Sequence, residues 1–276
     1  MIKLTLSFRH SQQSRSRGGG VALRSALAGF ALLALSTAPA SVQQLQSQAG
    51  TGSDASHNHQ QTADPTTFTA EELQQLERRF GVHGPQPKLA QLFTRGMDQL
   101  TPLRNHTVGR LDSLRPVVLR ESKRTGVNPM LLTAILFDEM QHAKPGEDLP
   151  LAAHSGLFST LGPAQLGLSE MVKQGLLRPD ASEAELADAR NQLLDPERNV
   201  SLLAGKMARL LTLLNRDPAN TFNVSTYRGN AKTVATLAYL HNGKLDYPAR
   251  ILRYMQDPEL HGLIFSQRRE PASGLI

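Results

Sequence analysis

The stretch from Gly126 to Met140, GVNPMLLTAILFDEM, constrains the fold more than any other part of the chain. Asn128 is a favoured N-cap residue and Pro129 suits the first helical position, so a helix is expected to begin there. Apolar residues recur along it at helical spacing, namely Leu132, Ile135, Leu136 and Met140. The segment therefore predicts a buried helix at the centre of a core.

An acidic residue, Glu139, occupies the position that completes this apolar stripe. Its neighbour Asp138 falls about 100° round an ideal helix, towards the flank, so Glu139 alone is expected to face inward. A carboxyl group on an apolar face loses hydration, which raises its pKa, and a general acid needs a raised pKa near neutral pH. The alternatives are a structural carboxylate paired with a buried Arg or Lys, and one that reaches solvent at the edge of the stripe.

Helical signals dominate the chain from Thr69 onward. Thr69 with Glu72 and Ser182 with Glu185 form capping boxes, and Asp195 caps the longest regular apolar stripe. No run alternates with period two, so we predict an all-α fold, or an α fold with a minimal sheet. Helices are expected over residues 69–80, 87–100, 102–125 with a possible break at Pro116, 230–241 and 247–256, and a short helix is expected to open at 162–165.

Residues 1–40 have the layout of a secretory signal peptide. They contain five basic residues and no acidic one, an apolar stretch over 26–35, and Ala38-Pro39-Ala40 as a small-x-small cleavage site. The apolar stretch falls short of the roughly 20 residues that a spanning helix needs, which argues against the alternative of a membrane anchor. We therefore predict export to the periplasm or cell envelope of a bacterium, with no integral membrane span in the mature form.

Composition narrows the function further. Removing the five basic residues of the predicted signal lowers the formal net charge from +6 to +1, which argues against a nucleic-acid partner. The absence of cysteine excludes disulfides, lipid attachment through cysteine and thiolate metal sites.

Residues 41–66 are rich in Gln, Ser, Thr, Gly and His and are expected to be a disordered linker. His57 and His59 within this linker make a poor metal site, and we expect neither a metal nor a cofactor. With 276 residues and 39% hydrophobic content, the chain predicts one domain over 67–276. Residues 67–110 are expected to be part of it, as an added helical cap or a partner-binding arm.

Four segments between residues 115 and 253 resemble the lysozyme-like domain of soluble lytic transglycosylases, which is related to goose-type lysozyme. In that family a G-V-x-P-x-L-L stretch leads to the catalytic Glu, which corresponds to Glu139. A G-x-x-Q motif corresponds to residues 162–165, a D-P-x-x-N helix to 195–199, and an L-A-Y-N motif with a following Gly to 237–243. The resemblance implies a lysozyme-like globular helical domain.

The chain departs from the family pattern in three places. Met140 follows the Glu where the family has Ser, and the Met of the family's G-L-M-Q is missing. Asn242 lies three residues after Tyr239, whereas in the family the Asn directly follows the Tyr. Matching on Gly243 would place His241 at the Asn position instead, but Tyr239 is the better local match. These departures leave open a domain that binds glycan without cutting it.

The resemblance implies a lytic transglycosylase that cleaves the β-1,4 bond between N-acetylmuramic acid and N-acetylglucosamine in peptidoglycan glycan strands. Glu139 would protonate the leaving oxygen and then act as base while the sugar's 6-hydroxyl closes a 1,6-anhydro ring, so one carboxylate suffices. The residues implied to bind the substrate or position the acid are Ser159, Gln165, Tyr239 and Asn242.

Two alternative functions stay open. A muramidase hydrolase generally needs a second carboxylate, about 5 to 9.5 Å from the first, for which Glu147, Asp148 and Glu170 are nearby candidates. A lysozyme-like domain without catalytic activity would bind the cell wall or dock on an envelope protein complex, with Glu139 as a structural remnant.

Overall fold

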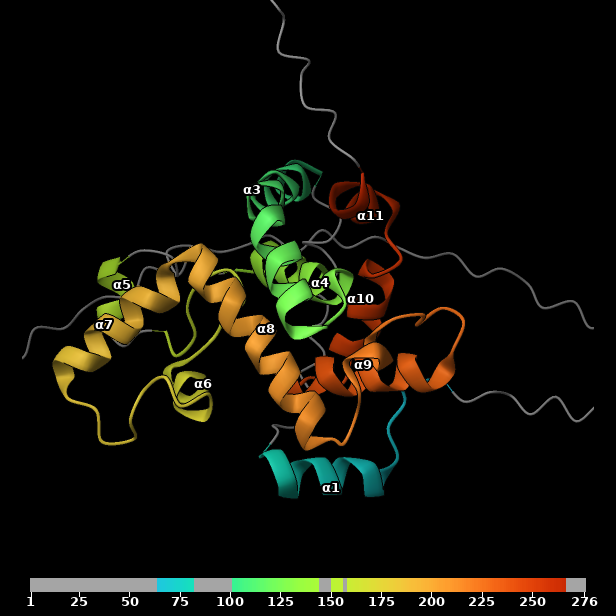
Figure 1. Ribbon diagram of the computed structural model, residues 1–276, viewed down its shortest axis with the longest axis horizontal. Coiled ribbons are helices and arrows are strands. Elements are labelled where there is room, and N and C mark those ends of the chain that lie inside the picture. Colours follow the sequence, from blue (N-terminus) through green and yellow to red (C-terminus); the bar gives the residue numbers. More distant parts are fainter. Residues whose placement is uncertain (1–63, 82–100, 144–149, 156–157, 267–276) are drawn as a thin grey trace, which may run out of the picture. The chain divides into compact units, whose positions relative to one another are not determined.

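Helices account for all the regular secondary structure in the part of the chain that the structure describes, which confirms the all-α prediction (Figure 1). The structure is a computed structural model, and it describes residues 64–81, 101–143, 150–155 and 158–266. These residues all belong to one compact unit, His59–Ile276. The predicted signal peptide and helix 87–100, nearly all of the predicted linker, and Glu147 and Asp148, lie outside the described residues.

The described helices occur in the following order along the chain. They are α1 (Ala70–Phe80), α3 (Thr101–Thr125), α4 (Pro129–Gln141), α5 (Pro150–His154), α6 (Leu168–Lys173), α7 (Glu183–Leu194), α8 (Pro196–Leu213), the 3₁₀ helix η1 (Pro218–Thr221), α9 (Arg228–Asn242), α10 (Tyr247–Tyr254) and α11 (Pro258–Phe265).

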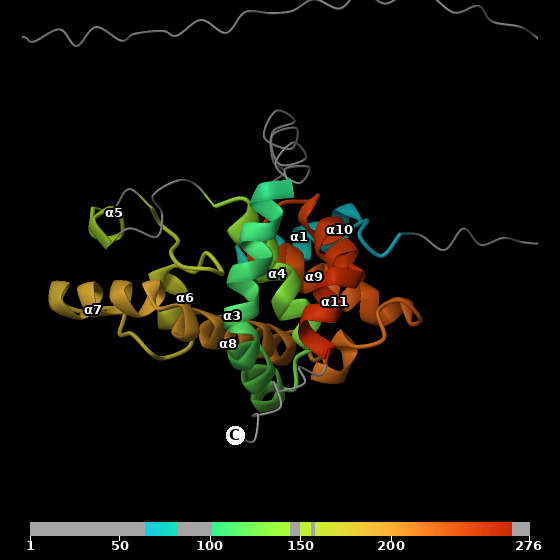
Figure 2. The same cartoon turned by 90° about the horizontal axis from the view of Figure 1, so that it is seen from above.

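Helix α4 is the centre of the fold, as its apolar sequence predicts. It packs against α3, α8, α10 and α11, which surround it in both views (Figures 1 and 2). Asn128 caps it by accepting a hydrogen bond from the backbone N–H of Met130 at 2.8 Å. The Asn128 amide in turn donates to the backbone carbonyl of Thr221 at 2.9 Å, which ties the start of α4 to η1. The cap therefore fixes α4 both locally and to a distant segment.

Local capping signals predict the starts of four helices correctly, α1, α4, α7 and α8. Both predicted capping boxes are formed, at Thr69 for α1 and at Ser182 for α7, and Asp195 caps α8. Helix α3 continues through Pro116 without ending there. Three described helices, α5, η1 and α11, were not predicted, although Asp257 before Pro258 gives α11 the same start signal as α8.

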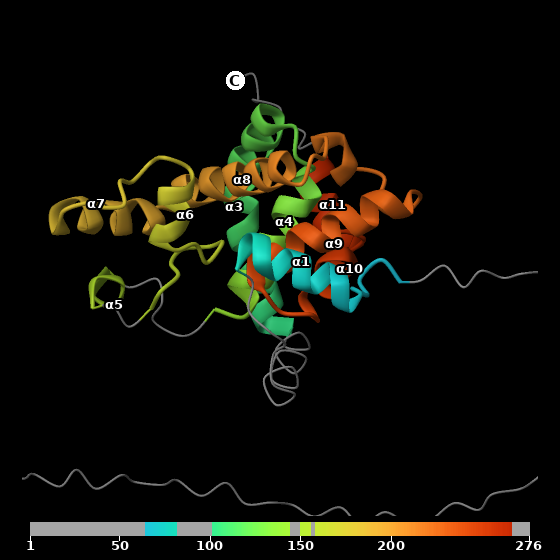
Figure 3. The ribbon, with the colours of Figure 1, turned by 90° about the horizontal axis from the view of Figure 1, so that it is seen from below.

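The proposed boundary of an added cap at residue 110 does not match the helices. Residues 101–110 form the first part of α3, and the buried Thr107 hydroxyl donates to the Gln141 side chain at the end of α4 at 2.9 Å. Helix α1 by contrast buries none of its own residues and lies beside α9 (Figure 3). The Lys232 ammonium of α9 contacts Glu72 at 2.9 Å, which anchors α1. None of the described helices combines the length and apolarity needed to cross a membrane.

Truncation of the α4 core is expected to be costly. Ile135 and Leu136 are both 0% exposed, so Ile135→Ala and Leu136→Ala should each lower the free energy of unfolding by about 2 to 5 kcal/mol. Leu151 is 86% exposed, and Leu151→Ala should change it by less than about 0.5 kcal/mol. Chemical denaturation measures all three. Losses near zero at Ile135 and Leu136 would show that α4 is peripheral.

Candidate active site

The two adjacent acids of α4 have opposite surroundings, and the prediction that Glu139 alone faces inward is wrong. Helix α4 is packed on all sides, so it has no solvent-facing flank for Asp138, whose side chain is 2% exposed. Glu139 is the one residue of α4 that is not fully buried, with a side chain that is 11% exposed. Glu139 therefore stands at an opening in the packing around α4.

Asp138 is the structural carboxylate of the pair. Arg250 of α10 donates to both of its oxygens, from Nε at 2.7 Å and from Nη2 at 3.1 Å, and also contacts Asp246 at 2.6 Å. Burial raises the pKa of the Asp138 carboxyl, but hydrogen bonds from His142 and Arg250 outweigh it, so this pKa lies below its ordinary value of 3.8. Asp138 is thus an ionised anchor between α4 and α10.

Glu139 is held by polar side chains from α9 and α10. Its Oε1 accepts hydrogen bonds from the Tyr247 hydroxyl at 2.8 Å and from the Asn242 amide at 3.2 Å. Nε2 of His241 lies 3.3 Å from the same oxygen. Oε2 makes no hydrogen bond to a described residue and is not a buried atom. One oxygen is therefore fixed by donors, while the other is free to meet a ligand.

A lysine on α8 orients the histidine behind Glu139. The Lys206 ammonium lies 3.1 Å from Nδ1 of His241 and 3.2 Å from its backbone carbonyl. Because an ammonium group only donates, Nδ1 accepts and Nε2 bears the hydrogen that faces Glu139. Burial and the nearby charge of Lys206 lower the pKa of His241, which keeps the ring neutral. Lys206, His241 and Glu139 thus form a hydrogen-bonded row from α8 to α4.

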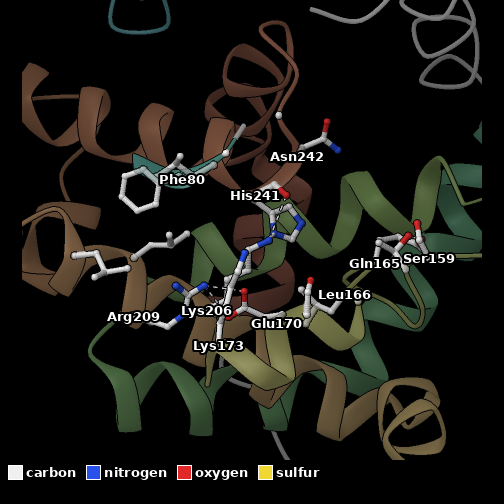
Figure 4. A pocket seen from close by; sticks show the side chains of 18 of the residues that line it. Phe80, Ser159, Gln165, Leu166, Glu170, Lys173, Lys206, Arg209, His241 and Asn242 are labelled. Atoms are coloured by element: carbon white, nitrogen blue, oxygen red, sulfur yellow. Dashed lines mark hydrogen bonds and ion pairs between the residues drawn. The ribbon is translucent and has the colours of Figure 1, made fainter. Parts of the chain in front are cut away.

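Glu139 opens into a cleft of about 270 Å³ that lies beside a larger pocket of about 520 Å³. The cleft is lined by residues of α4, α9 and α10 and of the loop before α6. The larger pocket, whose side chains Figure 4 shows, is lined by residues of α1, α6, α8 and α9 and of the same loop. Four residues line both spaces, namely Thr160, Gln165, His241 and Asn242. The two spaces are therefore adjoining parts of one site.

The segment predicted to open a helix at 162–165 is instead a tight turn, closed by an isolated bridge between Leu161 and Leu166. Asn199 of α8 holds this turn from behind, accepting from the Ala164 N–H at 2.7 Å and donating to the Leu161 carbonyl at 3.0 Å. Gly162 has a φ of +73°, and a Cβ there would lie 2.2 Å from the Leu193 carbonyl oxygen. The turn therefore needs both glycine and the buried Asn199.

This turn places Gln165 at the cleft in a fixed orientation. Gln165 itself has a positive φ of 47°. Its side-chain carbonyl accepts from the Thr160 hydroxyl at 2.8 Å, and its side-chain N–H donates to the Gly162 carbonyl at 3.2 Å. The amide is thus positioned before any ligand binds.

The structure brings some of the predicted site residues together and not others. Glu139, Gln165 and Asn242 line the same cleft, and Ser159 lines the larger pocket beside it. Tyr239 lines neither space. It is 4% exposed, and its ring packs against the ring of Phe68 with 5.2 Å between the centroids. The structure therefore corrects the alignment of the last family motif on Tyr239, because Tyr239 does not reach the site.

Three residues around Glu139 were not among the predicted site residues, namely Lys206, His241 and Tyr247. Tyr247 and His241 contact the Glu139 carboxylate, and Lys206 contacts His241. Matching the last family motif on Gly243 would have found His241. Tyr247 begins the helix predicted over residues 247–256, but nothing in its spacing marks it as a donor to Glu139.

The thermal and chemical stability of the chain is expected to depend on the titration of Lys206. Burial and the charges of Lys173 and Arg209 lower its pKa from 10.5 to about 8, against the opposing effect of Glu170 and Glu139. Below pH 8 the folded state bears the cost of a charged, half-buried lysine, and this cost is relieved as pH rises from about 8 to 10.5.

Lys206→Met removes this charge, so at pH 7 the variant should have a higher free energy of unfolding than the wild type. This difference should shrink by roughly 1 to 3 kcal/mol as the pH rises from about 8 to 10.5. Denaturant unfolding of both proteins at pH 7, 9 and 10.5 measures this difference. A difference that is constant with pH would show that Lys206 titrates normally.

Comparison of the chain with known protein families, with curated proteins and with solved structures finds no match. Among the described residues, no group of three or more His, Cys, Asp or Glu is placed to hold a metal ion. The function is therefore argued from the site geometry and from the resemblance of the sequence segments.

Proposed function

We propose that the protein is a peptidoglycan lytic transglycosylase in which Glu139 is the single catalytic carboxylate. The observation that supports this most is the difference among the carboxylates that line the site. Asp138 is held by Arg250 and Glu170 by Arg209, both through two guanidinium contacts, whereas Glu139 meets no arginine. Glu139 is thus the carboxyl group of the site that a ligand can meet without displacing an arginine.

The hydrogen bonds of Glu139 determine which oxygen would do the chemistry. Because donors from Tyr247, Asn242 and His241 converge on Oε1, the proton of the acid form belongs on Oε2, which faces the cleft. Oε2 would give this proton to the glycosidic oxygen as the bond from the muramic acid C1 breaks. The carboxylate would then take the proton of the 6-hydroxyl as that oxygen bonds to C1, which regenerates the acid.

The second carboxylate that a muramidase needs has no free candidate among the described residues lining the site. Both oxygens of Asp138 are occupied by Arg250, and Glu170 is bound to Arg209 and to the Gln174 amide. This favours a reaction in which the sugar's own hydroxyl, and not an activated water, attacks C1.

The remaining alternative is a domain that binds the cell wall without cutting it. Purified protein incubated with purified peptidoglycan sacculi should release soluble fragments in proportion to enzyme and time. A co-sedimentation assay on the same sacculi measures binding. Co-sedimentation without any soluble fragment would contradict the proposal and favour the binding domain.

The proposed function requires export. If cleavage follows Ala38-Pro39-Ala40, the mature protein begins at Ser41 and is found in the periplasm. N-terminal sequencing of the mature protein tests this. A protein that retains the basic segment of residues 3–24 would instead be membrane-anchored.

A further inference from the structure

The larger pocket beside the Glu139 cleft contains positive charge that no lining carboxylate balances. Its cationic residues are Arg79, Lys173, Lys206 and Arg209, and its one acidic residue in the described chain is Glu170. Arg209 contacts both oxygens of Glu170, at 2.7 and 2.9 Å. This pair neutralises itself, so the charges of the other three residues are left over.

Among the described residues, none of the three remaining cations contacts a carboxylate. Lys206 contacts the neutral ring and the backbone carbonyl of His241, and Arg79 donates to the backbone carbonyl of Leu213. Lys173 is exposed and forms no ion pair with a described residue. Figure 4 shows the side chains of Lys173 and Lys206 beside the Arg209–Glu170 pair, around one hollow. Like charges gathered in a pocket with low-dielectric walls attract an anion.

The pKa of Lys206 is lowered, and burial is the largest cause. Burial and the positive charges of Lys173 and Arg209 favour loss of its proton, although Glu170 on α6 and Glu139 on α4 oppose this. His241 of α9, the remaining titratable group that contacts Lys206, is neutral. An anion bound between Lys173 and Lys206 would supply the missing negative charge.

The position of the pocket indicates which ligand brings the anion. Because the pocket shares lining residues with the Glu139 cleft, a chain bound across the cleft can place a side group in the pocket. Muramic acid bears such a side group, a peptide with free carboxylates. The neutral hydroxyls of Ser159 and Ser169 also line the pocket and can donate to a carboxylate.

We propose that the pocket formed around Lys173 and Lys206 binds a carboxylate of the peptide attached to muramic acid. This inference rests on the proposed function, because it takes a peptidoglycan strand as the ligand of the cleft. It assigns the pocket a role in specificity, namely preference for strands that keep their peptides over bare glycan.

Binding measured apart from cleavage tests the pocket directly. The probe is N-acetylmuramoyl-L-alanyl-D-glutamate, and its uncharged diamide is the control ligand. Wild-type protein should bind the acid at least about fivefold more tightly than the diamide at pH 7. The preference should fall as pH rises above about 8, because Lys206 then loses its proton. Equal affinity for acid and diamide would overturn the inference.

Charge reversal at Lys173 then tests the role of the pocket on real strands. Lys173→Glu should lower the rate of fragment release from peptide-bearing sacculi by about five- to tenfold, and leave the rate on amidase-treated, peptide-free strands unchanged. Lys123→Glu is the matched control, because Lys123 is an exposed lysine on α3 that lines neither space. Equal loss on both substrates would overturn the inference. A preference for the acid probe without release from either substrate would support the pocket and contradict the transglycosylase.

Discussion

Glu139→Gln is expected to lower the rate of fragment release from sacculi by at least roughly 10²- to 10⁴-fold, the range typical of general acid–base groups. The glutamine side chain keeps the shape of the acid, and its carbonyl can still accept the hydrogen bonds of Tyr247 and Asn242. It has no carboxyl proton to give and cannot act as the later base. The free energy of unfolding should therefore change by less than about 1.5 kcal/mol, since one polar group replaces another at a partly open position.

Initial rates of fragment release and denaturant unfolding, measured on the same preparations, check this prediction. The retained stability matters because it separates a chemical defect from an unfolded protein. A variant that releases fragments at the wild-type rate would contradict the catalytic assignment of Glu139.

Asp138→Asn is expected to give the opposite pattern, a large loss of stability. The change leaves the buried guanidinium of Arg250 without its bidentate partner, which costs about 3 to 5 kcal/mol when one member of a buried pair is removed. Because the pKa of Asp138 is lowered from 3.8, the stabilisation is present above that pH in the wild type and is lost only as pH falls below it. Denaturant unfolding at pH 7 measures the difference.

Asp180→Asn is the control for this second prediction, because Asp180 is exposed and its removal should change stability by less than about 0.5 kcal/mol. A loss below about 1 kcal/mol at Asp138 would show that the Arg250 pair is not the anchor between α4 and α10. The two α4 variants together separate the chemical acid from the structural one.

Local sequence signals predicted the starts of α1, α4, α7 and α8, because caps depend on residues within one turn of each other. Asn128, Ser182 and Asp195 each accept a hydrogen bond from a backbone N–H two or three residues on. The apolar stripe of α4 likewise predicted burial. These features need no knowledge of the rest of the chain.

The roles of the two acids could not be predicted this way, because they depend on which helices surround α4. Periodicity assigns one buried face, but α4 is enclosed on every side and only the packing decides where it opens. Arg250, which pairs with Asp138, and Tyr247, which donates to Glu139, both lie more than 100 positions further along the chain. No spacing rule links positions so far apart.

The turn at 161–166 illustrates the same limit. Residues 162–165 have a helix-start composition, but the buried Asn199 of α8 satisfies the backbone of a turn there instead. The side chain that decides the local structure thus belongs to another helix. The sequence motif marked Gln165 as a site candidate, and the structure places it at the cleft, while its fixed orientation follows from this tertiary contact.

The measurement that tests the central claim most directly is mass spectrometry of the fragments released from sacculi in water enriched in oxygen-18. A transglycosylase that uses the 6-hydroxyl gives 1,6-anhydro ends, one water lighter than reducing ends, with no label from the solvent. We predict this result for the wild type and its loss in Glu139→Gln. Reducing ends that incorporate oxygen-18 would show that an activated water attacks C1, and would contradict the single-carboxylate transglycosylase.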